Sequence, residues 1–289
     1  MLWDPPRVAF TLPWVNLAVT WYGILFAIGF FVGYRVIISQ LKARFQAKTV
    51  QIVDRLAFYV FLGTVIGSRI GHLFFYENLQ EFIEDPLEIF RMEGLASHGA
   101  VVGIMMAAYL FYRSVKKELE VSSFLTILDW LILPVCTAAV FIRFGNFMNQ
   151  EILGTSTELP WGVIFGHPVD GLSGMARHPA QLYEAFFYLL LLMVLWKRRS
   201  FFAEAGQLAG VFLMTSFGFR FLIEGVKVEQ SALLLQSNFP LTMGQILSIP
   251  LIILGVLFFF WRKLSPQKKQ ELDDLHQKEQ EATDPKTVL

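Results

Sequence analysis

Seven long apolar stretches constrain this chain more than any other feature of its sequence. Each is about 20 residues long, the length that an α-helix needs to cross the hydrocarbon core of a membrane. Runs of this length predict helices rather than the alternating ten-residue strands of a membrane barrel. The stretches cover residues 17–38, 50–74, 95–113, 122–145, 179–196, 207–225 and 242–262. We therefore predict an all-α polytopic membrane protein with seven transmembrane helices.

The composition agrees with a membrane protein. Hydrophobic residues make up 55% of the chain and charged residues 17%, whereas an ordinary soluble domain carries about 25% charged residues. The net charge is zero, so nothing in the charge balance predicts a nucleic-acid partner. A single cysteine, Cys136, excludes an internal disulfide and a cysteine-based zinc site. We expect Cys136 to be a small buried core residue.

The distribution of basic residues predicts the orientation. Lysine and arginine cluster after the first, third, fifth and seventh stretches, whereas the alternate loops hold only Arg91, Arg177 and Lys227. Because basic loops stay in the cytoplasm, the N-terminus is predicted outside and the C-terminus inside. The first residues lack the pattern of a cleaved signal peptide, so we expect them in the mature protein.

Residues 1–263 are predicted to form one transmembrane catalytic domain, and residues 264–289 a charged, disordered cytoplasmic tail. The loop over residues 146–178, here called the cap, is expected to fold outside the membrane, with a short strand in its WGVIF run. Glycines four residues apart in the first three stretches are expected at helix contacts. They are Gly29 with Gly33, the trio Gly63, Gly67 and Gly71, and Gly99 with Gly103.

A group of ionisable residues inside or beside the stretches falls at the predicted outer face. It includes His98, Arg143, Glu151, Arg177, His178, Glu184, Arg220 and Glu224. We expect them to converge beneath the cap, around a pocket open to the outside and to lipid. Two arginines at headgroup level suit a phosphate, and a nearby histidine suits proton transfer at neutral pH. The set predicts phospholipid chemistry at the outer leaflet.

Simpler interpretations of these residues stay open at this point. Arg220 and Glu224 are four residues apart and can simply neutralise each other. His98 can be a hydrogen-bonded residue at a helix start, and His178 before Pro179 a turn into a helix. Asn146 can satisfy backbone groups of the cap. At the level of the whole chain, a secondary transporter would require polar residues across the membrane, and a structural scaffold would leave the outer cluster unexplained.

The motifs around these residues resemble the prolipoprotein diacylglyceryl transferase family. Its signature runs Gly-Arg-x-Gly-Asn-Phe-x-Asn-x-Glu-x-x-Gly, and residues 143–154 keep that spacing from the arginine onward. Further agreeing stretches are WYG at 21–23, HGAVVG at 98–103, RHPAQLYEA at 177–185, RFLIE at 220–224 and MGQILSIP at 243–250. The chain departs from the family pattern at Ile142, at Ala100 and at residues 227–230, where the family has Arg-x-Pro-Asp.

The resemblance implies transfer of the diacylglyceryl group from phosphatidylglycerol to the lipobox cysteine thiol of a prolipoprotein, with release of glycerol phosphate. It implies a multi-pass protein of the bacterial inner membrane, with its active site toward the outer leaflet. We expect a monomer that needs no metal and no cofactor. The expected catalytic residues are His98, Arg143, Arg220 and Glu224, with His98 as the candidate base. The expected substrate-binding residues are Arg143, Asn146, Glu151, Gly154, Tyr22 and His178.

Overall fold

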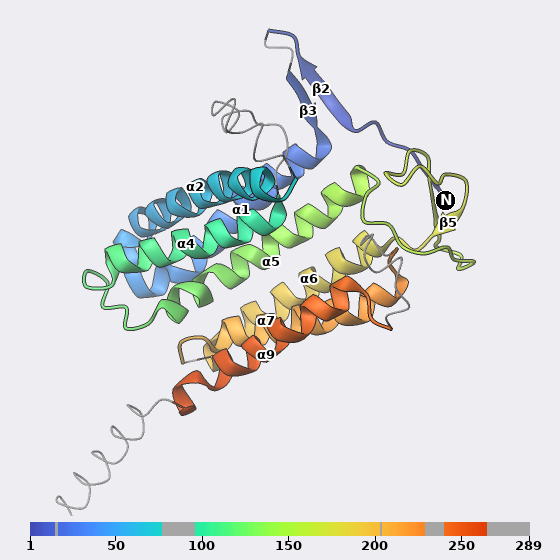
Figure 1. Cartoon of the computed structure of the whole chain (residues 1–289). Coiled ribbons are helices and arrows are strands. Elements are labelled where there is room, and N and C mark those ends of the chain that lie inside the picture. The colour runs from blue at the N-terminus through green and yellow to red at the C-terminus, as the bar shows by residue number, and fades with distance from the viewer. Residues whose placement is uncertain (15–16, 77–95, 203, 229–239, 265–289) are drawn as a thin grey trace, which may run out of the picture. The chain divides into compact units, whose positions relative to one another are not determined.

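The computed structural model describes residues 1–14, 17–76, 96–202, 204–228 and 240–264 (Figure 1). The chain divides into two compact units, one of residues 1–196 with 226–228 and one of residues 197–225 with 229–289. Long helices occupy all seven predicted stretches. They are α1 (Trp21–Phe45), α2 (Thr49–Tyr76), α4 (Ser97–Val115), α5 (Phe124–Met148), α6 (Ala180–Arg198), α7 (Gln207–Ile223) and α9 (Met243–Leu264). Apart from Leu264, which ends α9, the predicted tail lies outside the described residues.

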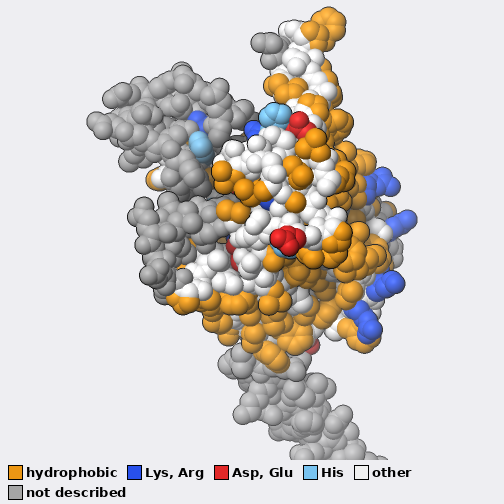
Figure 2. Space-filling view, turned by 90° about the vertical axis from the view of Figure 1, so that its right-hand side faces the viewer, with side chains coloured by type: hydrophobic (Ala, Val, Ile, Leu, Met, Phe, Trp, Pro, Cys, Tyr) orange, Lys and Arg blue, Asp and Glu red, His pale blue; other side chains and the backbone are white. Residues whose placement is uncertain are grey.

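The helices confirm the all-helical polytopic class. Within the described ranges, five segments are long and apolar enough to cross a membrane, and the first of them, residues 21–74, contains α1 and most of α2. Hydrophobic side chains, drawn in orange, cover much of the face shown in Figure 2. Phe31, Phe58, Val102 and Phe186 are each more than 60% exposed on α1, α2, α4 and α6. Exposed apolar side chains at this density are typical of helices that face lipid.

In the first unit, glycines bring the helices together as the sequence predicts. An added Cβ at Gly71 would lie 2.6 Å from the Cα of Gly99, so α2 and α4 touch backbone to backbone. On α1, a Cβ at Gly29 would lie 2.9 Å from the Cβ of Phe141 on α5. These contacts confirm the packing role of the glycines. They join α4, which carries His98, to α2, and α5, which carries Arg143, to α1.

Replacing Gly67 by leucine is expected to separate α2 from α4. A Cβ at this position would lie 2.7 Å from the Cα of Gly103, where only backbone movement makes room. Such overpacking costs about 1–3 kcal/mol or more, so the melting temperature in detergent should fall. Gly218→Leu on α7 is the control, because no described atom lies within 4 Å of an added Cβ there. Equal melting temperatures for the two variants would contradict the close contact.

The first helix begins later than the sequence analysis predicts. Residues 17–20 form strand β3 (Leu17–Thr20), which pairs antiparallel with β2 (Val8–Leu12) in a hairpin. Thr20 then caps α1, its Oγ1 accepting a hydrogen bond of 3.1 Å from the backbone N–H of Gly23. The predicted start at residue 17 was wrong because valine, leucine and threonine suit a strand as well as a membrane helix.

The cap contains a small sheet that also includes the N-terminus. Strand β4 (Val163–Phe165) lies within the WGVIF run, which confirms the expected strand, and it pairs with β5 (Ala176–Arg177). On its other side β4 pairs in parallel with β1 (Leu2–Trp3). Trp3 also packs on Phe147 and donates a hydrogen bond from its ring to the carbonyl of that residue. The first residues of the chain are therefore part of the cap structure.

In the second unit, α7 packs against α9 through another pair of glycines. A Cβ at Gly210 would lie 2.6 Å from the carbonyl oxygen of Gly255. At the end of α7, the carboxylate of Glu224 lies against Gly244 at the start of α9. This contact fixes the position of Glu224 within its own unit.

Candidate active site

Arg143, near the end of α5, is the centre of a polar network in the first unit. Its Nη1 donates to Oδ1 of Asn146 at 3.1 Å, and its Nη2 lies 3.2 Å from Oε1 of Glu184 on α6. Asn146 in turn donates from Nδ2 to Oε1 of Glu151 at 2.8 Å. The network therefore joins α5, α6 and the start of the cap through three predicted site residues and Glu184.

Glu184 was placed in the outer cluster by the sequence analysis but was assigned no catalytic or binding role. Its side chain is 3% exposed, and the same Oε1 that pairs with Arg143 lies 3.7 Å from Nζ of Lys227. Lys227 stands where the family pattern has arginine, and its side chain is 8% exposed. The substitution keeps a cation beside Glu184. Residues 229 and 230, which also depart from the family pattern, lie outside the described residues.

The backbone around Glu151 adopts an unusual conformation. Gln150 and Ile152, on either side of it, have positive φ angles of 55° and 57°, which are unfavourable for a side chain branched at Cβ such as Ile152. The buried Gln181 donates from Nε2 to the carbonyl oxygen of Glu151 at 2.6 Å. Strained residues persist where their surroundings hold them, and they are frequent in functional sites.

Gly154 and Tyr22, two of the predicted substrate-binding residues, lie very close to neighbouring parts of the chain. A Cβ at Gly154 would lie 2.6 Å from the Cβ of His178, so no larger residue fits at Gly154 without displacing the neighbouring chain. A Cβ at Gly145 would lie 2.7 Å from the ring of Tyr22 on α1. Tyr22 also lies close enough to interact electrostatically with Glu151 and Arg143. The structure thus places Tyr22 and Gly154 beside the network.

His178 lies at the junction of the cap with α6. Its backbone N–H donates to the carbonyl of Thr155 at 3.0 Å, and its ring Nδ1 lies 3.2 Å from the hydroxyl of Tyr183. Trp161 donates to the same hydroxyl at 2.7 Å. These contacts agree with the simpler interpretation, in which His178 shapes the entry into a helix. Its role in substrate binding stays a prediction.

The other predicted catalytic residues lie at the start of α4 and in the second unit. His98 is the second residue of α4 and its side chain is exposed. Arg220 and Glu224 belong to the second unit, where Nε of Arg220 lies 3.8 Å from Oε1 of Glu224. That pairing agrees with mutual neutralisation, and convergence with Arg143 stays a prediction. Within the described ranges, no group of three or more His, Cys, Asp or Glu side chains is placed to hold a metal ion.

A second polar cluster, between the N-terminus and the cap, was not predicted. Asp4 pairs through Oδ1 with the ring Nδ1 of His167 and accepts a hydrogen bond of 3.4 Å from Nε2 of Gln150. The Oε1 of Gln150 accepts the backbone N–H of His167 at 2.7 Å. The bond to His167, with help from Gln150, keeps the pKa of Asp4 below its ordinary value. No sequence pattern indicates a cluster whose members are this far apart in the chain.

Comparison with known proteins identifies the family. A family model described as prolipoprotein diacylglyceryl transferase matches residues 7–261. The chain belongs to this family. Among curated diacylglyceryl transferases, it is 35% identical to that of Protochlamydia amoebophila over 91% of this chain and 95% of the relative. It is 37% identical to that of Tolumonas auensis over 83% and 90%, and 38% identical to that of Porphyromonas gingivalis over 88% and 92%.

Membership in the diacylglyceryl transferase family confirms the resemblance drawn from the motifs. Each of these relatives is named phosphatidylglycerol–prolipoprotein diacylglyceryl transferase. The match to the family model covers parts of both units and includes Arg143 as well as Arg220. Arg143, Asn146 and Glu151 of the polar network lie within the family signature over residues 143–154.

Proposed function

We infer that this protein is a transferase that moves the diacylglyceryl group of phosphatidylglycerol to the lipobox cysteine thiol of a prolipoprotein. The reaction forms a thioether, releases glycerol phosphate and is the first step of lipoprotein maturation. The observation that carries this inference is the family match over residues 7–261. The names of the curated relatives give the donor and the acceptor, and their transferase activity favours an enzyme over the transporter and scaffold alternatives.

The guanidinium of Arg143 is proposed to bind the phosphate of the donor lipid. Two of its nitrogens are held by Asn146 and Glu184, and a guanidinium has five N–H donors in a planar fork. The remaining donors suit phosphate oxygens, which arginine binds as a charge-assisted pair. The side chain of Arg143 is 16% exposed, which leaves it accessible to a ligand. The network thus orients Arg143 without using all of its donors.

His98 is proposed to take the proton from the acceptor thiol. A free thiol has a pKa of about 8.5 and attacks as the thiolate, so a base accelerates the reaction. The thiolate sulfur attacks the glyceryl carbon that bears the phosphate, and a carbon–sulfur bond forms as the carbon–oxygen bond breaks. The bonding electrons leave with the phosphate oxygen as glycerol phosphate. Negative charge grows on that oxygen, where arginine donors stabilise it.

The other predicted residues have supporting roles in this proposal. Arg220 is a second phosphate ligand held by Glu224, to which it is paired within α7 and the following turn. Asn146 and Glu151 orient the headgroup through the network. Tyr22, Gly154 and His178 shape the wall between α1, the cap and α6.

The membrane arrangement follows from the basic loops. We propose seven crossings in the bacterial inner membrane, with the N-terminus outside, the C-terminus inside and the site toward the outer leaflet. Residues 1–263 form the catalytic domain and residues 264–289 a cytoplasmic tail. The protein acts as a monomer. Cysteine labelling with a membrane-impermeant reagent, in intact cells and in inside-out vesicles, tests the orientation. Labelling of the cap only in the inside-out vesicles would refute it.

The activity is tested directly with purified protein. Phosphatidylglycerol labelled in its acyl chains is incubated with a peptide that contains a lipobox cysteine, and thioether product is measured by mass spectrometry. A matched peptide with serine in place of the cysteine is the control, because it offers no thiol. Absence of product from the cysteine peptide, with lipid and folded protein present, would refute the proposed function.

Replacing His98 by glutamine is expected to lower kcat by about 10²–10⁴-fold, the usual contribution of general acid–base catalysis. Affinity for phosphatidylglycerol should change little, because the base acts on the thiol and not on the phosphate. Transfer rates across a range of lipid concentrations, together with the pH dependence of kcat, separate the two effects. Equal losses of kcat and lipid affinity would instead assign His98 a structural role.

A further inference from the structure

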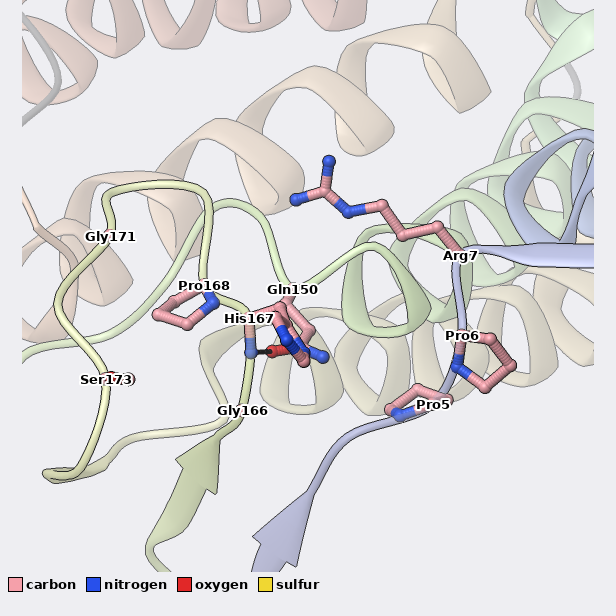
Figure 3. Close-up of a pocket in the computed structure, with 9 residues that line it drawn as sticks. All are labelled: Pro5, Pro6, Arg7, Gln150, Gly166, His167, Pro168, Gly171 and Ser173. Atoms are coloured by element: carbon pink, nitrogen blue, oxygen red, sulfur yellow. Dashed lines mark hydrogen bonds between the residues drawn. The ribbon is translucent and has the colours of Figure 1, made fainter.

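A hollow lies between the N-terminal segment and the cap, outside the polar network of Arg143, Asn146, Glu151, Glu184 and Lys227, which is here called the phosphate network. It is lined by residues 5–7 on one side, by the loop 166–173 on the other, and by Gln150 between them (Figure 3). Its volume of about 530 Å³ lies in the range of known ligand sites. All of these residues belong to the first unit.

The walls of the hollow are held in place by contacts between distant parts of the chain. β1 pairs with β4, and the amino group of Met1 donates to the carbonyl of Gly162 at 3.1 Å. At the base, Asp4 and His167 join the two walls, and the buried Gln150 bonds to both. The hollow is therefore formed by fixed elements of the cap and the N-terminus.

The charge of the hollow comes mainly from Arg7. The carboxylate of Asp4 is occupied by His167 and Gln150, and the nearby Asp170 pairs with Arg177 at 2.7 Å. Arg7 is exposed, and its side chain forms no ion pair or hydrogen bond with any residue in the described ranges. Figure 3 shows this side chain extending from the N-terminal segment toward the side of the hollow that the loop forms. An unpaired guanidinium beside prolines and an amide suits a peptide that carries a carboxylate.

The position of the hollow indicates which peptide reaches it. Gln150 at its base directly precedes Glu151 of the phosphate network, and adjacent Cα atoms are about 3.8 Å apart. A prolipoprotein whose cysteine reacts beside the network continues outward from the membrane as its mature sequence. An extended chain covers about 3.3–3.6 Å per residue. The first few residues after the cysteine are thus the part of the substrate that meets the hollow.

We propose that this hollow is a subsite for the extracytoplasmic residues that follow the lipobox cysteine, and that Arg7 favours acidic side chains there. The proposal rests on the proposed function, because it names a second contact of the same peptide substrate. It assigns a role to the N-terminal segment, which holds no residue of the phosphate network. Arg7 acts on peptide binding and not on the chemical step.

The test is a charge swap. Lipobox peptides with two aspartates or two lysines after the cysteine are assayed for transfer, and the ratio of KM for the basic peptide to KM for the acidic peptide is compared between variants. Because an anionic lipid surface itself attracts basic peptides, only the change in this ratio is informative. Arg7→Gln should lower it about threefold and Arg7→Glu about tenfold, as expected for exposed charge pairs. High salt should reduce both changes.

Glu158→Lys is the matched control, because Glu158 is an exposed charge of the cap outside the hollow. The ratio of KM for the basic peptide to KM for the acidic peptide should be the same in Glu158→Lys as in the unmodified protein. If Arg7→Glu leaves the KM ratio unchanged, the hollow is not a peptide subsite. If the Arg7→Glu protein misfolds, the KM ratio of Arg7→Gln provides the same test. A changed KM for phosphatidylglycerol with an unchanged peptide ratio would place a lipid headgroup there and overturn the proposal. Failure of the unmodified protein to lipidate either peptide would instead refute the proposed function.

Discussion

Replacing Arg143 by alanine is expected to reduce diacylglyceryl transfer to a small fraction of its normal rate. Loss of one well-aimed donor to a developing oxyanion costs about 2.7–4 kcal/mol, or 10²–10³-fold in kcat. The alanine variant also leaves the buried Glu184 with Lys227 as its remaining described cation. Arg143→Lys should recover part of the rate, because it restores the charge but not the planar fork. The measurement is thioether formation per folded protein, with folding checked by melting temperature.

The matched control for Arg143 is another arginine that pairs with a glutamate. Arg55 lies 3.1 Å from Glu118, and both side chains are well exposed, at 41% and 61%. Exposed pairs contribute about 0–1 kcal/mol, so Arg55→Ala should retain normal transfer and nearly normal stability. Normal transfer by a folded Arg143→Ala protein would refute the phosphate role. If Arg143→Ala and Arg55→Ala both lose transfer to the same extent, the loss would reflect a general effect of removing a positive charge.

The sequence was sufficient to predict the helices because length and hydrophobicity determine them. A run of about 20 apolar residues has few alternatives in lipid, and the glycine spacing of α2 and α4 indicated the face on which they meet. The N-terminal sheet could not be predicted in the same way. β1 has two residues and pairs with a strand that lies about 160 residues further along the chain. Two residues carry no periodic signal, so only the folded chain reveals the pairing.

The residues of the site were likewise predictable from the sequence only in part. Arg143, Asn146 and Glu151 lie within one short motif, and the structure joins them in one network. Glu184 lies in another motif, and its pairing with Arg143 depends on how α5 packs beside α6. Lys227 was noted as a basic residue of an outer loop and as a departure from the family pattern, yet it lies beside the same carboxylate. Charge partners that are distant in the sequence are set by tertiary packing, which residue spacing does not encode.

Replacing Glu184 by alanine is expected to have the second largest effect. This carboxylate is 3% exposed and is shared by Arg143 and Lys227, at 3.2 and 3.7 Å. Breaking a buried pair by removing one partner costs about 3–5 kcal/mol, because a charge remains buried without compensation. The melting temperature should therefore fall, and transfer should fall with it as Arg143 loses its orientation. Glu184→Gln keeps the shape and an acceptor oxygen, so its losses should be smaller.

The control for Glu184 is Glu118→Ala, which removes the exposed partner of Arg55 and should change stability by less than about 1 kcal/mol. A double variant, Glu184→Gln with Lys227→Met, separates charge balance from geometry. It removes one negative and one positive charge from the network, so a melting temperature above that of Glu184→Gln alone would show that charge balance contributes to stability. If the double variant regains stability but not transfer, Glu184 acts mainly by orienting Arg143. Melting and transfer of Glu184→Ala that match those of Glu118→Ala would show that this carboxylate does not hold Arg143 in place.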